Sequence, residues 1–202
     1  MFDAAVRQVI DRPLNRAGAT LAAWGATANQ VTAAGLALGL AAAGAVAFER
    51  FGLALLLIAA SRLCDGLDGA VARATRKTAF GGYLDITADF LFYGAVPLGF
   101  ILADPASNGI AGGVLLTSFY FNGASFLGYA ILAEKRAMAT SHQGEKSLYF
   151  SNGLLEGTET IAFFVAICLF PGAFPVLAAI FAALCFVTAT LRIHAASKIF
   201  AE

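Results

Sequence analysis

The chain has 202 residues, of which 59% are hydrophobic and only 13% are charged, and its mean hydropathy is +0.78. This composition is atypical of a soluble globular domain and indicates a membrane protein. The 13 basic residues equal the 13 acidic residues, so the overall charge suggests no nucleic-acid partner. Cys64, Cys168 and Cys185 lie in apolar segments without metal-ligand spacing and are interpreted as small hydrophobic residues.

Residues 1–28 are predicted to form an amphipathic helix at the membrane surface. Apolar residues recur there at helical spacing, and three arginines fall largely on the opposite face: Arg7, Arg12 and Arg16. Such arginines can meet anionic lipid head groups, although packing of the helix on the protein itself is the alternative. Pro13 is expected to kink or restart the helix. We expect no cleaved presequence, because charged residues occupy the place of its apolar stretch.

Residues 29–202 are predicted to form one domain of six membrane-spanning helices. The hydrocarbon core needs about 20 apolar residues per helix, and six stretches of about that length are separated by polar breaks. They cover residues 30–48, 51–75, 79–102, 110–133, 147–170 and 176–196. The segments ADPASNG (103–109) and PGAFP (171–175) have the composition of turns. The expected fold class is therefore an all-α integral membrane protein with an N-terminal amphipathic helix.

The basic residues predict the orientation of these helices. If the six spans alternate, nearly all lysines and arginines fall on one side, and only Arg50 lies in a loop on the other. Positively charged loops stay in the cytoplasm. This predicts a multi-pass protein of the cytoplasmic membrane of a bacterium, with both termini inside.

Four aspartates lie within these apolar stretches. Asp65 and Asp68 are three residues apart on the second predicted helix, and Asp85 and Asp89 are four apart on the third, so each pair shares a helix face. A carboxylate near the membrane centre costs roughly 2.5–3.5 kcal/mol, so four of them need compensation. Two divalent cations would neutralise them, and ligands that are all oxygen favour Mg²⁺, Mn²⁺ or Ca²⁺.

The residues around the aspartates allow more than one role. Gly66, Gly69, Gly81 and Gly82 would let another group approach the backbone, and Arg73 could reach a phosphate oxygen. Together they indicate phosphoryl-type transfer from an amphiphile that carries a diphosphate, with one carboxylate as the base. The alternatives are an ion or proton pathway, or internal salt bridges to basic residues: Arg62, Arg73, Arg76 and Lys77.

The pattern Asp65-x2-Asp68-Gly69-x2-Ala72-Arg73-x7-Gly81-x3-Asp85-x3-Asp89 resembles, at every fixed position, the signature of the CDP-alcohol phosphatidyltransferase family. The resemblance implies an enzyme that transfers a phosphatidyl group from CDP-diacylglycerol, or a related CDP-lipid, to the hydroxyl of a small alcohol and releases CMP. It implies that the four aspartates hold two divalent ions, Mg²⁺ or Mn²⁺, and that Asp89 is the general base. It also implies a homodimer and an active site that faces the cytoplasm.

The same resemblance implies a set of donor-binding residues besides the aspartates. They are Gly66, Gly69, Ala72, Arg73 and Gly81 of the motif, together with Asn29 and Thr32. ANQVT (28–32) is similar to the Pro-Asn-x-x-Thr entry of the family's first helix, although Ala28 stands in place of the proline. Helix capping is the alternative role for Asn29 and Thr32.

The acceptor is not determined by the motif. Lys146, Arg192 and Arg136 lie at the cytoplasmic ends of predicted helices and could bind a phosphorylated acceptor such as glycerol 3-phosphate, the preferred candidate, or inositol phosphate. Positive-inside topology alone would also explain Arg136. Glu156 and Glu159 could pair with Arg192 or Arg62, or could bind the hydroxyls or amine of an acceptor such as serine. A membrane cation or proton transporter is the alternative from another functional class.

Overall fold

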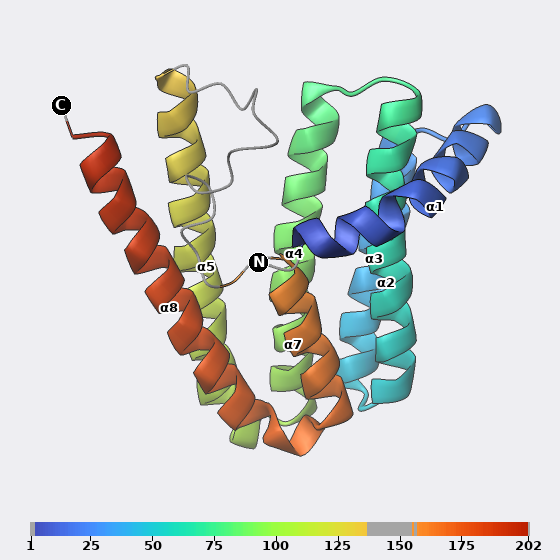
Figure 1. The fold of residues 1–202 in the computed structure, drawn as a ribbon. Helices are drawn as coiled ribbons and strands as arrows, with labels where there is room; N and C mark the ends of the chain where they lie inside the picture. Colours follow the sequence, from blue (N-terminus) through green and yellow to red (C-terminus); the bar gives the residue numbers. More distant parts are fainter. Residues whose placement is uncertain (1–2, 137–154, 156, 202) are drawn as a thin grey trace.

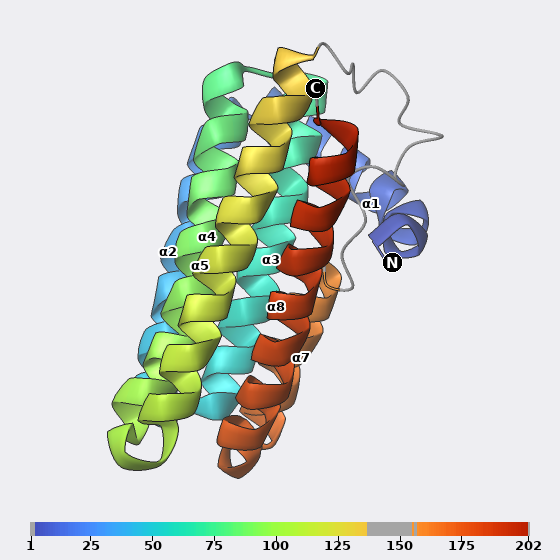
Figure 2. The ribbon, with the colours of Figure 1, turned by 90° about the vertical axis from the view of Figure 1, so that its left-hand side faces the viewer.

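The computed structural model describes residues 3–136, 155 and 157–201, and this part of the chain consists of helices joined by short turns, which confirms the all-α class. Long helices run side by side as a bundle, and α1 crosses one side of it (Figure 1, Figure 2). The elements are α1 (Asp3–Ala23), α2 (Ala28–Ala47), α3 (Phe51–Ala74), α4 (Ala79–Ala103), α5 (Pro105–Lys135), α7 (Gly157–Leu169), the 3₁₀ turn η1 (Pro171–Ala173) and α8 (Phe174–Ile199).

Four helical segments of the described chain are long and apolar enough to cross a membrane: α2, α4, α5 and the stretch Pro171–Ile199. Helix α3 is not among them, because every 18-residue window of it contains Arg62, Asp65 and Asp68. Helix α7 has 13 residues and is about 20 Å long, shorter than a hydrocarbon core of about 30 Å. The count of six spans therefore stays a prediction.

The basic residues gather at one end of the bundle. The turn between α3 and α4 and the C-terminal ends of α5 and α8 all lie at the upper end in Figure 1. This end carries Arg73, Arg76, Lys77, Lys135, Arg136 and Lys198. Arg50 lies at the opposite end, in the turn between α2 and α3. The orientation in the membrane remains a prediction, and this arrangement has the charge distribution that it requires.

Helix α1 packs against α3. A Cβ on Gly18 would lie only 2.5 Å from the Cβ of Ala70, so a glycine is needed for the two helices to approach this closely. Pro13 lies inside α1, which runs as one helix, so the expected restart at Pro13 is wrong. The contact with α3 agrees with packing of α1 on the protein itself. The location of α1 at a membrane surface stays a prediction.

Helices α2 and α4 touch through their backbones. A Cβ on Gly99 would lie 2.5 Å from the carbonyl oxygen of Ala43, which leaves no room for a larger residue. Helix α2 begins with a capping box, in which the Thr27 hydroxyl accepts from the N–H of Gln30 at 3.3 Å and the Gln30 side chain accepts from the N–H of Thr27 at 3.0 Å. The capping box thus fixes where α2 begins, and the Gly99 contact brings α2 and α4 close together.

The turn predicted over residues 103–109 is shorter than expected. Asp104 is the N-cap of α5 and accepts a hydrogen bond from the N–H of Ser107 at 3.0 Å, and Pro105 is the first helical residue. Aspartate at the cap and proline in the first turn favour a helix start. The same residues are also typical of turns, which is why the sequence placed the start of this helix too late.

An aromatic core joins α4 to the C-terminal helices. The rings of Phe100 and Phe174 stack with centroids 4.6 Å apart, and those of Phe92 and Phe164 meet edge to face at 5.6 Å. All four side chains are fully buried. Aromatic pairs of this kind add about 0.5–1.5 kcal/mol beyond the area they bury. The core thereby holds α4, which carries Asp85 and Asp89, in a fixed position.

Candidate active site

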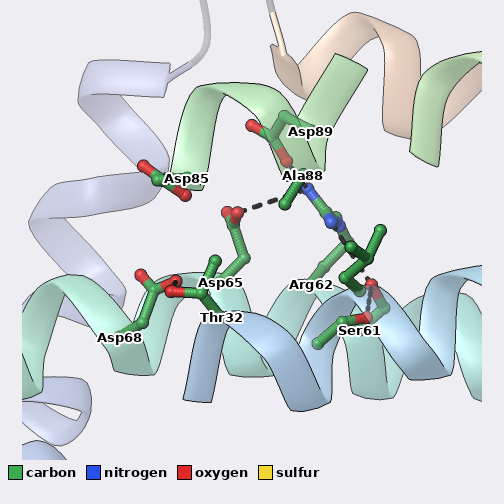
Figure 3. A pocket seen from close by; sticks show the side chains of 10 residues that line it. Thr32, Ser61, Arg62, Asp65, Asp68, Asp85, Ala88 and Asp89 are labelled. Atoms are coloured by element: carbon green, nitrogen blue, oxygen red, sulfur yellow. Dashed lines mark hydrogen bonds and ion pairs between the residues drawn. The ribbon is translucent and has the colours of Figure 1, made fainter. Parts of the chain in front are cut away.

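A small polar pocket lies where α2, α3 and α4 meet (Figure 3). It is lined by Thr32, Gly35, Leu36, Ser61, Arg62, Asp65, Asp68, Asp85, Ala88 and Asp89. All four aspartates singled out in the sequence are among these residues. The pocket therefore gathers side chains from three helices around the predicted metal ligands.

Three of the four carboxylates converge. Asp65, Asp85 and Asp89 each have an oxygen within 4.8 Å of the others. In Figure 3, Asp65 reaches up from α3 toward α4, which carries the other two. The expectation that the acidic faces of two neighbouring helices oppose each other is confirmed for these three residues.

Asp68 is held by a different contact. Its residue is 6% exposed, and the hydroxyl of Thr32 donates a hydrogen bond of 2.6 Å to its Oδ2. The Thr32 Oγ1 also lies 3.0 Å from the carbonyl oxygen of Ala28. Since Thr27 is the N-cap of α2, helix capping by Asn29 or Thr32 is wrong. Thr32 instead ties α2 to an aspartate of α3.

Arg62 lies between two of the aspartates. Its Nη1 is 2.7 Å from the Oδ1 of Asp89 and 3.4 Å from the Oδ1 of Asp65. Its Nη2 donates to the Oγ of Ser61 at 3.2 Å. The internal salt bridge considered as an alternative for the aspartates therefore exists, and Arg62 forms it with two of them.

The composition of the pocket fits a divalent cation. Four carboxylates and one guanidinium leave three formal negative charges. The converging ligand atoms of Asp65, Asp85 and Asp89 are all oxygen, which Mg²⁺ and Mn²⁺ prefer over nitrogen or sulfur. Three of the four aspartates singled out in the sequence are thus close enough together to share an ion, and the ligand role of Asp68 stays a prediction.

Two further donor-binding candidates lie beside the pocket. A Cβ on Gly81, in the first turn of α4, would lie 3.3 Å from the Oδ1 of Asn29, in the first turn of α2. Neither residue lines the pocket itself. The two helix starts nevertheless bring Asn29 and Gly81 into contact near the acidic cluster, which their spacing in the sequence alone could not show.

The remaining motif residues of α3 face α1 or the solvent. A Cβ on Gly66 would meet the side chain of Leu14 at 2.9 Å, so this glycine makes room for α1. Arg73 is exposed, and its Nε donates to the Oδ1 of Asn15 at 3.0 Å. The Nη1 of Arg73 lies 3.3 Å from where a Cβ on Gly69 would be, and Ala72 is half-buried.

None of the acceptor candidates that the structure describes lines the acidic pocket. Arg192, on α8, is 8% exposed, and its Nη1 donates to Asn122 Oδ1 at 2.8 Å and to Ser125 Oγ at 2.6 Å. Arg136 donates to the carbonyl oxygens of Ile199 and Phe200, at 3.0 and 3.2 Å. Glu159 lies in the first turn of α7. Lys146 and Glu156 lie outside the described residues.

Three side chains of this region carried no functional interpretation in the sequence: Asn15, Ser61 and Thr27. Ser61 donates to the carbonyl oxygen of Gly35 at 2.8 Å and so supports Arg62 from α2. Asn15 is 58 residues from its partner Arg73. No periodicity or spacing connects residues so far apart, whereas the Thr27-x2-Gln30 capping box is a local signal that could have been found.

Comparisons with known proteins agree with this geometry. The sequence model of the family described as CDP-alcohol phosphatidyltransferase matches residues 26–193. The chain is 47% identical over 169 residues to the inner membrane protein YnjF of Escherichia coli, covering 84% of this chain and 82% of that protein. It is 40% identical over 98 residues to the archaetidylinositol phosphate synthase of Pyrococcus horikoshii, covering 48% and 52%.

A solved structure has the same fold. The phosphatidylinositol phosphate synthase of Mycobacterium tuberculosis, crystallised with CDP-DAG bound, superposes with a TM-score of 0.67 at 22% identity, covering 92% of this chain and 94% of that one. At this identity the likeness shows the fold alone. The family match spans most of the chain and includes the whole aspartate motif, and on that ground the chain belongs to the CDP-alcohol phosphatidyltransferase family.

Proposed function

We propose that this enzyme transfers the phosphatidyl group of CDP-diacylglycerol to the hydroxyl of a small phosphorylated alcohol and releases CMP. The observation that carries the proposal is the convergence of Asp65, Asp85 and Asp89 beside Asp68, at the motif positions of a family of CDP-alcohol phosphatidyltransferases. The fold relative with CDP-DAG bound supports a CDP-lipid donor.

The four aspartates would hold two divalent ions, Mg²⁺ or Mn²⁺. When bound, such ions neutralise the diphosphate of the donor and stabilise the departing phosphate of CMP. Asp89 accepts the proton of the acceptor hydroxyl while the oxygen of that hydroxyl forms a bond to the phosphorus of the phosphatidyl group. The bond from that phosphorus to the CMP oxygen breaks in the same exchange.

The donor-binding residues have distinct tasks in this proposal. Thr32 holds Asp68 by its hydrogen bond of 2.6 Å, so that this carboxylate keeps one orientation. Gly69 and Gly81 leave the backbone of α3 and α4 open to the nucleotide, with Asn29 beside Gly81. Arg73 is exposed at the end of α3 and neutralises a phosphate oxygen of the donor.

The surroundings of Arg192 support the proposal that the acceptor is phosphorylated. Among the residues that the structure describes, its guanidinium makes no ion pair and contacts neutral oxygens of Asn122 and Ser125. A buried cation without a counter-charge is costly, and an anionic ligand offsets that cost. The named synthases among the relatives suggest inositol phosphate, and glycerol 3-phosphate has the same anionic group.

The protein is proposed to work in the cytoplasmic membrane with its site facing the cytoplasm, as a homodimer. The relative YnjF is described as an inner membrane protein, and the acids lie in the half of α3 and α4 that is nearest the basic end of the bundle. A transporter is less well supported, because its acids would lie midway through the membrane rather than near one end.

Purified protein tests the proposal. It is incubated with CDP-diacylglycerol, Mn²⁺ and one acceptor at a time: glycerol 3-phosphate, inositol phosphate, inositol or serine. CMP release and the mass of the lipid product are measured. We expect CMP release with one phosphorylated acceptor and none when Mn²⁺ is chelated. Release with inositol or serine in preference would contradict the phosphorylated acceptor, and no release with any alcohol would contradict the transferase proposal for these substrates.

A further inference from the structure

Arg62 is part of the acidic cluster, although the family motif does not include it. We propose that Arg62 is a resident cation of the cluster, which holds Asp65 and Asp89 together and opposes the binding of divalent ions there. The inference rests on the proposed function, because it takes these aspartates as the ligands of the ions. It assigns to Arg62 a positioning role and not a catalytic one.

The first support is the contact that Arg62 makes with the two aspartates. Its Nη1 lies 2.7 Å from the Oδ1 of Asp89, the distance of a charge-assisted hydrogen bond, and 3.4 Å from the Oδ1 of Asp65. Both residues belong to the group of three whose oxygens converge. An ion that takes the same oxygen of Asp89 as a ligand therefore competes with the shortest contact of Arg62.

The second support is that Arg62 is held in place by contacts other than the aspartates. Its guanidinium lies over the ring of Phe92, 4.3 Å from the ring centroid, in cation–π geometry. Its Nη2 donates to Ser61, which itself donates to the carbonyl oxygen of Gly35. The side chain is only 18% exposed. Arg62 therefore cannot move to the solvent without losing several interactions at once.

The third support is the charge of the cluster. A divalent ion that enters beside Arg62 meets a fixed positive charge, and like charges repel more strongly in a partly buried pocket than in bulk water. Without Arg62 the aspartates would present four formal negative charges in place of three. Removal of the Arg62 charge should therefore make divalent ions bind more tightly.

A purely structural salt bridge predicts a different outcome. If Arg62 only stabilised the packing of α3 against α4, its removal would loosen the aspartates and would weaken ion binding or leave it unchanged. Tighter binding after removal of a side chain does not follow from damage to the fold. The direction of the change in affinity thus separates the two roles.

The experiment measures Mn²⁺ affinity in the purified full-length protein, by calorimetry or by the magnetic resonance signal of free Mn²⁺. We expect Arg62→Gln to bind Mn²⁺ about tenfold more tightly than the original protein, a change of about 1.4 kcal/mol. Arg62→Lys keeps the charge and should stay within about threefold. Arg76→Gln, which removes an exposed charge in the turn after α3, is the matched control and should leave the affinity unchanged.

Thermal unfolding gives a second measurement. Without metal, Arg62→Gln should unfold at a lower temperature, because Asp65 and Asp89 lose their counter-charge, and saturating Mn²⁺ should close the gap to the original protein. If Arg62→Gln does not fold, Ser61→Ala serves as the second variant. It removes the hydroxyl that accepts from Arg62 Nη2, so the guanidinium is held less firmly and the affinity for Mn²⁺ should rise about threefold. Unchanged or weaker affinity in the folded variant overturns the proposal. Because no substrate is present, this failure is distinct from a failure to release CMP.

Discussion

The α2–α4 half of the molecule, the acidic half, and the α5–α8 half, the basic half, differ in how their polar side chains are paired. In the acidic half, four aspartates and one arginine line the pocket, and Arg62 contacts two of the aspartates. In the basic half, Arg192 is buried, and within the described part of the chain its guanidinium contacts neutral oxygens of Asn122 and Ser125. Our proposal assigns cations to the acidic half and the anionic acceptor to the basic half.

The two halves meet through side chains that carry no charge. Phe119 of α5 lies edge to face with Phe164 of α7 and with Phe181 of α8, and Phe164 in turn packs against Phe92 of α4. Phe92 and Phe164 thus form an uncharged contact between the two halves. The comparison teaches that one small bundle can hold an ion pair in one half and an arginine paired with neutral oxygens in the other.

The largest expected effect is in the acidic half. Asp89→Asn keeps the shape of the side chain but removes the proposed base, so CMP release should fall about 10³-fold while the protein stays folded. Steady-state CMP release measures it. Asp104→Asn is the matched control, because it removes the same charge at the far end and asparagine still caps α5. Normal turnover by Asp89→Asn would show that another group accepts the proton.

The next effect should be confined to the basic half. Arg192→Gln removes the proposed charge-assisted contact with the acceptor phosphate, worth about 1.5–3 kcal/mol, so the KM for the phosphorylated acceptor should rise about 10–100-fold. The KM for CDP-diacylglycerol should change little. Lys198→Gln, at an exposed position on the same helix, is the control. Equal changes in both KM values would break the division between the halves.

A smaller effect tests the packing of the acidic half. Gly99→Ala places a methyl group against the Ala43 carbonyl oxygen and should lower the free energy of unfolding by about 1–3 kcal/mol. Gly94→Ala on the same helix has no atom within 4 Å of its new Cβ and should be neutral or stabilising. Unfolding in detergent by heat or denaturant measures both. Equal stabilities would mean that α2 and α4 can separate without cost.

The smallest effect concerns the contact between α1 and Arg73. Asn15→Ala removes one exposed hydrogen bond, worth about 0.5–1.5 kcal/mol, so the KM for CDP-diacylglycerol should rise about threefold with kcat nearly unchanged. Thr20→Ala is the control, since its hydroxyl donates to the Arg16 carbonyl oxygen of its own helix. A loss of kcat in place of a higher KM would contradict a role in positioning Arg73.

The sequence predicted the acidic half well. The expected helices 30–48, 51–75 and 79–102 agree with α2, α3 and α4 to within two residues at every end. Each is a mostly apolar run bounded by charged or turn-forming residues, which is a strong local signal even where the run contains the functional charges. The aspartates followed from spacing on two such helices joined by a short turn.

The contacts inside the site could not be predicted from spacing. Helical periodicity indicates which face a residue occupies, but not which oxygen it contacts on a helix many residues away. Arg62 contacts Asp89, 27 residues along the chain, because α3 packs on α4. Ser61 donates to the carbonyl oxygen of Gly35 because α3 also packs on α2. The start of α5 was misplaced for a different reason, because Asp104 and Pro105 favour both a turn and a helix start.

The charges of α3 also bear on how the protein is made. A nascent helix enters lipid from the insertion machinery according to its own polarity, and each of Arg62, Asp65 and Asp68 opposes that step by up to about 2.5–3.5 kcal/mol. We therefore expect α3 to depend on α2 and α4 beside it for its place in the membrane. Substitutions that weaken the contacts of α3 with these neighbours should reduce the amount of enzyme in the membrane.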